Sequence, residues 1–136
     1  MGFAGSIEIQ MLCWSIVLGL VQLLLATTTA ALQQGIVYNM SSRDLPAPPV
    51  GRVAARLLRA FRNFLETFPL FAAAVLAIAM LGRHDDLSAA GARIYFWARV
   101  LYVPVYAAGV PVARTMIWAV SIFGLILVLL AATAGG

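Results

Sequence analysis

Arginine side chains recur inside apolar stretches of this chain, where they could bind an anionic ligand. Arg59, Asn63 and Glu66 are spaced i, i+4 and i+7, so a helix would place all of them on one face. A charged side chain at membrane depth costs about 2.5–3.5 kcal/mol on insertion scales, so it persists where it faces a partner or a ligand. These residue types favour the binding of carboxylate or phosphate groups through bidentate guanidinium contacts.

Two further apolar stretches carry polar residues at helical spacing. Arg99, Tyr102 and Tyr106 are spaced i, i+3 and i+7, and Arg114 and Thr115 stand near the start of the last stretch. If the chain crosses the membrane four times, these three groups of polar residues all lie toward the same side of the membrane. They can then meet in one site. The sequence therefore predicts one cationic pocket, with these residues: Arg59, Arg62, Asn63, Glu66, Arg99, Tyr102, Tyr106, Arg114 and Thr115.

The balance of charge in this pocket favours a ligand over a purely structural role. In the structural alternative, Glu66 neutralises Arg59 or Arg99 and only holds helices together. Arg62 and Arg114 would then still be unpaired. A surplus of positive charge in a low dielectric attracts an anion with more than one carboxylate or phosphate oxygen.

The composition excludes an ordinary soluble protein. The chain has 136 residues, of which 63% are hydrophobic and 10% are charged, whereas soluble domains have about 25% charged residues. The net charge is +4 and every basic residue is Arg, but these residues are interleaved with apolar stretches, so we expect no nucleic-acid binding. The single cysteine, Cys13, allows no disulfide framework and no metal cluster, and we expect a buried, inert thiol.

Four apolar stretches are long enough to cross a hydrocarbon core of about 30 Å. Backbone groups in lipid must be paired within their own segment, so these stretches must be helices. A proline-rich loop at 41–49 follows the first stretch, and Ser88 is the expected N-cap of the third. We predict an all-α membrane protein, a four-transmembrane-helix bundle forming a single domain over 1–136, with spans at about 9–32, 51–81, 89–108 and 112–133.

The distribution of arginines predicts the orientation. The side of the bundle that holds the first and third connections is richer in Arg, and by the positive-inside rule it lies in the cytoplasm. Both termini are then on the non-cytoplasmic side. The short chain and its exclusive use of Arg are typical of a bacterial protein, so we expect a bacterial inner membrane.

At the predicted pocket the sequence resembles the MAPEG superfamily, the membrane-associated proteins in eicosanoid and glutathione metabolism. The segment 59–67, Arg-Ala-Phe-Arg-Asn-Phe-Leu-Glu-Thr, resembles the Arg-Ala-x-x-Asn-x-x-Glu signature of helix two in that family. The pattern Arg99-x-x-Tyr102-x-x-x-Tyr106, followed by Arg114, is similar to that of its glutathione-binding members. One departure lies in the first span, where Leu32-Gln33-Gln34-Gly35 replaces a region that is basic in the eukaryotic enzymes.

The resemblance implies a homotrimer that binds glutathione, as a co-substrate, between neighbouring subunits near the cytoplasmic surface. Arg114 and Thr115 would lie at the thiol and carry the catalysis. Contacts to the rest of glutathione would come from Arg59, Arg62, Asn63, Glu66, Arg99, Tyr102 and Tyr106.

These expectations favour a membrane-bound glutathione-dependent transferase or peroxidase that acts on small lipophilic electrophiles arriving through the lipid. Trp118 and apolar neighbours would form the wall against which the second substrate rests. The alternative is a non-catalytic trimeric scaffold of the same fold that binds lipid or peptide. A small transporter or channel subunit is a third reading, but the chain has neither an inverted repeat nor an acidic pathway.

Overall fold

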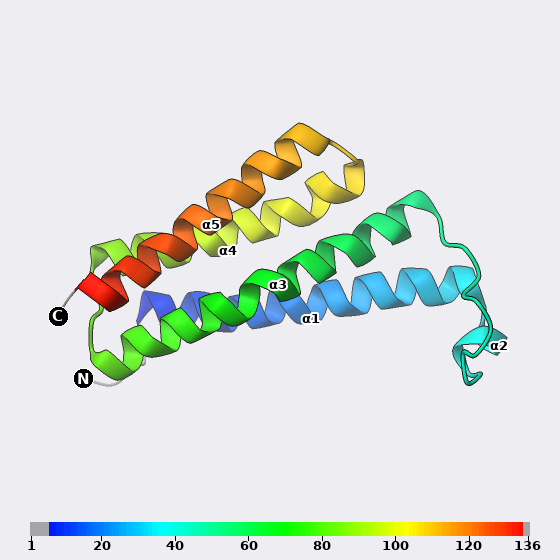
Figure 1. The fold of residues 1–136 in the computed structure, drawn as a ribbon, viewed down its shortest axis with the longest axis horizontal. Helices are drawn as coiled ribbons and strands as arrows, with labels where there is room; N and C mark the ends of the chain where they lie inside the picture. Colours follow the sequence, from blue (N-terminus) through cyan, green and yellow to red (C-terminus); the bar gives the residue numbers. More distant parts are fainter. Residues whose placement is uncertain (1–5, 135–136) are drawn as a thin grey trace.

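Four long helices and one short helical turn make up residues 6–134, the part of the chain that this computed structural model describes (Figure 1). Each of the predicted helices is present, with slightly different ends. The short helix was not predicted; it follows Gly35, whose φ of 92° ends the first helix. The elements are α1 (Ile7–Gln34), α2 (Ile36–Asn39), α3 (Arg52–Leu81), α4 (Asp86–Ala108) and α5 (Pro111–Ala134).

The start of α4 differs from the prediction. Its N-cap is Asp85 and not Ser88, which lies three positions further on. The Ser88 backbone N–H donates to Asp85 Oδ1 at 2.8 Å, and the Asp85 backbone N–H donates to Ser88 Oγ at 3.0 Å. Such a reciprocal capping box satisfies two backbone donors at once, and therefore the helix begins earlier than a lone serine cap would allow.

The four long helices form two antiparallel hairpins, α1 with α3 and α4 with α5 (Figure 1). The hairpins converge at the end of the molecule that holds the start of α1 and the end of α5. They diverge at the opposite end, which holds the start of α3 and the turn between α4 and α5 (Figure 1).

Two glycines bring α4 and α5 into close contact. A Cβ atom on Gly91 would lie 2.6 Å from the carbonyl oxygen of Gly124, and one on Gly124 would lie 2.7 Å from the backbone nitrogen of Tyr95. Only hydrogen fits at either position. Small residues at a crossing allow the close backbone approach that is typical of membrane helices.

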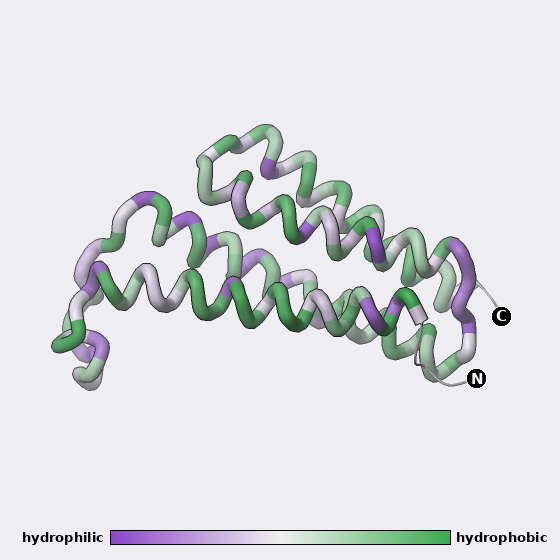
Figure 2. The backbone as a smooth tube through the Cα atoms, turned by 180° about the vertical axis from the view of Figure 1, so that it is seen from behind, coloured by the Kyte–Doolittle hydropathy of each residue, from purple (hydrophilic) through white to green (hydrophobic). Residues whose placement is uncertain are grey.

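The buried face of α1 is more polar than its outer face. Ser15 and Gln22 are buried, whereas Trp14 and Leu24 are each 57% exposed. Hydrophobic residues run along most of each long helix (Figure 2). Cys13 is also exposed on this outer face, so the prediction of a buried thiol was wrong.

Three helices, α1, α3 and α5, are long and apolar enough to cross a membrane. The five charged residues of α3 all lie between 52 and 66, whereas α4 carries its charged residues, Asp86, Arg93 and Arg99, along much of its length. Of these, Arg99 is buried in the protein interior and Arg93 is exposed.

Candidate functional site

A cavity of about 400 Å³ lies between α3, α4 and α5 at the diverging end of the molecule. We call it the main cavity. It gathers every residue of the predicted pocket except Arg99, and the predicted wall residue Trp118 also lines it. The lining residues are Arg59, Arg62, Asn63, Glu66, Tyr102, Tyr106, Arg114, Thr115 and Trp118.

The helical spacing of α3 places its polar residues on the cavity side. Arg59, Arg62 and Glu66 are exposed in the single chain, whereas Asn63 is half-buried. Within residues 6–134 the one ion pair joins His84 to Glu8, at the other end of the molecule. Glu66 therefore forms no ion pair with an arginine of the described chain.

Tyr106 connects the three helices that line the main cavity. Arg59 Nε donates to the Tyr106 hydroxyl oxygen at 3.2 Å, and the Arg114 guanidinium carbon lies 4.9 Å from the centre of the Tyr106 ring. Tyr102 contacts the same ring edge-to-face, with ring centres 5.5 Å apart. Contacts between guanidinium groups and aromatic faces offset part of the cost of desolvating the cations. They leave most guanidinium N–H groups free for a ligand.

Arg99 lies behind Tyr102 and does not line the main cavity. It is 1% exposed, and its guanidinium carbon lies 4.2 Å from the centre of the Tyr102 ring and 5.8 Å from that of Phe64. No described residue accepts a hydrogen bond from its Nε, Nη1 or Nη2. Arg99 is therefore a buried cation in contact with Tyr102, which lines the main cavity.

Arg114 and Thr115 lie in the first turns of α5. The Thr115 hydroxyl donates to the Pro111 carbonyl oxygen at 3.0 Å, so its hydrogen is engaged within the helix. Within residues 6–134 no acceptor is bonded to the Arg114 guanidinium group, which lies over the Tyr106 ring face. A free guanidinium beside a helix N-terminus favours a negatively charged group such as a thiolate.

The glutamines that replace the basic region of the first span do not reach the main cavity. Gln33 accepts a hydrogen bond from the Gly51 backbone N–H, and Gln34 Nε2 donates to the Pro48 carbonyl oxygen at 3.2 Å. Both side chains hold the proline-rich loop against the end of α1. Their role here is to fix the start of α3.

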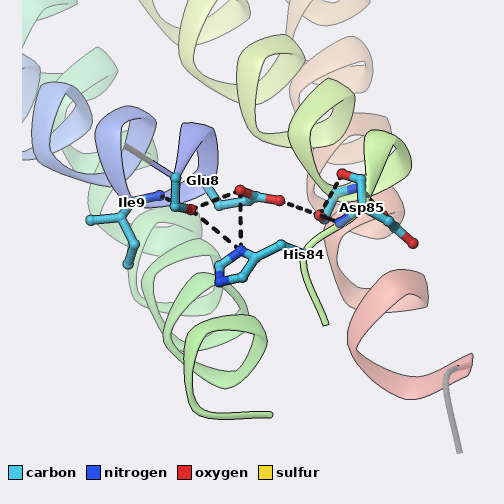
Figure 3. Close-up of polar contacts among 6 residues, drawn as sticks. Glu8, Ile9, His84 and Asp85 are labelled. Atoms are coloured by element: carbon cyan, nitrogen blue, oxygen red, sulfur yellow. Dashed lines mark hydrogen bonds and ion pairs between the residues drawn. The ribbon is translucent and has the colours of Figure 1, made fainter. Parts of the chain in front are cut away.

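A second polar group, which sequence reasoning missed, lies at the converging end (Figure 3). Glu8 is 2% exposed, accepts hydrogen bonds from the hydroxyls of Ser6 and Ser88, and lies 3.3 Å from His84 Nδ1. We call these four residues the Glu8 cluster. The only signal in the sequence was a lone carboxylate at the start of an apolar stretch. Because the chain itself supplies its partners, the cluster joins α1 to the α3–α4 connection.

A comparison with known protein families identifies the family of this chain. The model of the MAPEG family matches residues 11–134, which include almost all of the four long helices. No curated protein matches the chain. The family covers glutathione-dependent transferases and related proteins. Together with three apolar helices, the match indicates an integral membrane protein. The chain belongs to the MAPEG family.

Proposed function

We propose that the protein is a membrane-bound glutathione-dependent transferase that acts on lipophilic electrophiles. The observation that carries this proposal is the unpaired charge of the main cavity, where Arg59, Arg62 and Arg114 face a single carboxylate, Glu66. Glutathione carries two carboxylates, one ammonium group and a thiol. An arginine surplus with one carboxylate is the complement of that set of charges.

The charged ends of glutathione bind to α3. Arg59 and Arg62 take the carboxylates, with Asn63 as a neutral hydrogen-bonding partner, and Glu66 takes the ammonium group. These residues lie along one face of the helix, so an extended or bent tripeptide can follow it. Tyr102 and Tyr106 form the opposite wall.

The thiol lies at Arg114, in the first turns of α5. A free thiol has a pKa near 8.5 that falls beside a cation, and the thiolate is the nucleophile. The thiolate sulfur attacks the electrophilic carbon, a C–S bond forms, and the leaving group departs with its bonding pair. A bond from Thr115 to the sulfur requires its hydroxyl to turn away from Pro111. Trp118 faces the lipophilic substrate.

Peroxidase activity follows from the same site when the electrophile is a lipid hydroperoxide. The thiolate attacks the peroxide oxygen, the O–O bond breaks, and the alkoxide takes a proton from solvent. A second glutathione then reduces the sulfenic acid to leave a disulfide and water. Both reactions depend on one thiolate beside Arg114.

The functional unit in this proposal is a homotrimer with four spans in each subunit. Arg62 and Glu66 are exposed on a helix apolar enough to cross a membrane. Charges facing lipid are costly, which supports a neighbouring copy that covers this face; the number three comes from the family resemblance. The fourth span is α4, whose Arg99 is turned inward. The membrane is a bacterial inner membrane, and both termini lie outside the cytoplasm.

The proposal is tested by melting and turnover of the purified protein in a neutral detergent. Glutathione at a hundred times its dissociation constant should stabilise the protein by about 2.7 kcal/mol. The Arg114→Gln variant should lose conjugation of glutathione to a chlorodinitrobenzene electrophile. Arg93→Gln is the matched control, because Arg93 is exposed on α4 and does not line the main cavity. Absence of a melting shift at millimolar glutathione would favour the scaffold alternative.

A further inference from the structure

A second cavity, of about 180 Å³, adjoins the main cavity at the turn between α4 and α5. It is lined by Arg56, Arg59, Arg114, Tyr106 and the turn residues 109–111. No acidic residue is among them. Three guanidinium groups therefore line this second cavity. Its volume of about 180 Å³ is less than half the 400 Å³ of the main cavity.

Most hydrogen-bond donors of this second cavity are free. Arg56 Nη1 donates to the Ala107 carbonyl oxygen at 3.3 Å, and Arg59 uses its Nε for Tyr106. Within residues 6–134 the remaining guanidinium N–H groups of these two arginines, and all guanidinium N–H groups of Arg114, have no bonded acceptor. Each guanidinium can still present at least one pair of N–H groups to a ligand.

The backbone of the turn is shaped around Arg56. Gly109 has a φ of 77°, and a Cβ there would lie 2.5 Å from the guanidinium carbon of Arg56. The glycine therefore serves two purposes, the left-handed conformation and the space for the guanidinium. The first turn of α5 adds the positive end of a helix to the same space. Pro111 opens that turn without a backbone N–H.

We infer that this second cavity binds a phosphate group. Three guanidinium forks match the several oxygens and multiple charge of a phosphate better than the two oxygens and single charge of a carboxylate. The cavity lies at the ends of helices in a membrane protein, where headgroups lie. Basic pockets between membrane helices bind anionic phospholipid headgroups in this way. The phosphate can come from such a headgroup or from free phosphate in solution.

Substitution of Arg56 or of Arg62 changes the lining of one cavity without changing that of the other. Arg59 and Arg114 line both, whereas Arg56 lines only the second and Arg62 only the main cavity. A bound phosphate therefore shares two cations with the ligand of the main cavity, and each should weaken the binding of the other. This inference does not rest on glutathione as the ligand of the main cavity.

The test is thermal melting of the full chain in a neutral detergent. The probes are inorganic phosphate and short-chain dihexanoyl phosphatidic acid, with sodium chloride at the same ionic strength and dihexanoyl phosphatidylcholine as controls. Arg56→Gln should raise the apparent dissociation constant for phosphate at least about tenfold, the scale of a charge-assisted hydrogen bond. Arg62→Gln should leave it unchanged. Because Arg56 also holds the end of α4, Arg56→Lys keeps the charge and should restore part of the affinity.

The outcomes are separable. Stabilisation by inorganic phosphate assigns the site to free phosphate, and stabilisation by the lipid alone assigns it to a headgroup. An equal shift with chloride, or equal losses in Arg56→Gln and Arg62→Gln, would overturn the inference. If Arg56→Gln does not fold, Arg56→Lys serves instead, because it keeps the positive charge but loses the guanidinium fork, and it should still lower phosphate affinity relative to the parent. Loss of phosphate binding with glutathione binding retained would leave the proposed function intact.

Discussion

The two ends of the molecule differ in whether their charged side chains have partners within the chain. At the converging end, the carboxylate of Glu8 is buried and the chain supplies its partners, from Ser6, Ser88 and His84 (Figure 3). At the diverging end, Arg62 and Arg114 have no carboxylate partner within residues 6–134. A charge whose partners lie in the chain holds helices together, whereas a charge without them is available to a ligand.

A further contact at the converging end joins the two hairpins. Arg83 Nη1 donates to the Ala132 carbonyl oxygen and so ties the α3–α4 connection to the end of α5. With the Glu8 cluster, this contact fixes both hairpins where they converge.

The largest effect is expected at Arg114. Arg114→Gln removes the cation beside the thiol and should lower the rate of conjugation about 100-fold to 1,000-fold, the range for loss of one charge-stabilising group. Its melting temperature without ligand should stay near that of the parent, because Arg114 makes only a contact with a ring face. Initial rates at saturating glutathione measure the effect, and turnover equal to that of Arg93→Gln would exclude the role of Arg114.

Glu8→Ala should produce the reverse pattern. The change leaves the buried hydroxyl of Ser88 without its carboxylate partner and should lower the free energy of unfolding by about 1–3 kcal/mol. Glutathione affinity should not change, since the Glu8 cluster lies at the other end of the molecule. Denaturant melts and calorimetry measure the two quantities. Asp86→Asn, at an exposed position in the same region, is the matched control.

Glu66→Gln tests whether the carboxylate of Glu66, unlike that of Glu8, contributes to ligand binding and not to stability. Glu66 has no ion-pair partner in the described chain, so the variant should be as stable as the parent without ligand. Its affinity for glutathione should fall about tenfold, because one charge-assisted bond to the ammonium group is weakened. Calorimetric titration gives the affinity. A large loss of stability in the absence of ligand would show that Glu66 is structural after all.

Salt should produce the smallest difference between the ends. The main cavity is open, so its contacts with a charged ligand are screened, and glutathione affinity should fall a few-fold between about 0.01 and 0.15 M salt. Glu8 and Ser88 are buried, and the contribution of the Glu8 cluster to melting should change little. Parallel titrations and melts at two salt concentrations check this, and equal sensitivity at both ends would remove the distinction.

Local periodicity was sufficient to predict most of the main cavity. Arg59, Asn63 and Glu66 share a face because a helix repeats every 3.6 residues, and the antiparallel order of the four long helices brings that face to the side of Arg114. Neither step needs side-chain packing. Arg99 shows the limit, because spacing places it on the face of Tyr102 but does not say which of the two lies nearer the cavity.

The Glu8 cluster was beyond the reach of sequence patterns. Glu8 and Ser88 are 80 positions apart, and no local rule links them. The start of α4 was missed for a related reason, since Asp85 and Ser88 cap the helix jointly while Ser88 also serves Glu8. Contacts that depend on how two hairpins meet are set by tertiary packing, and a single sequence does not encode them as a visible period.

In the proposed function, unpaired guanidinium groups of the main cavity bind the carboxylates of a thiol peptide. The most direct measurement is a calorimetric comparison of glutathione with its diethyl ester, which keeps the thiol and the ammonium group but has no carboxylate charge. Glutathione should bind, and the affinity for the ester should be lower by at least about tenfold. Equal affinity for the two compounds would contradict the proposed function.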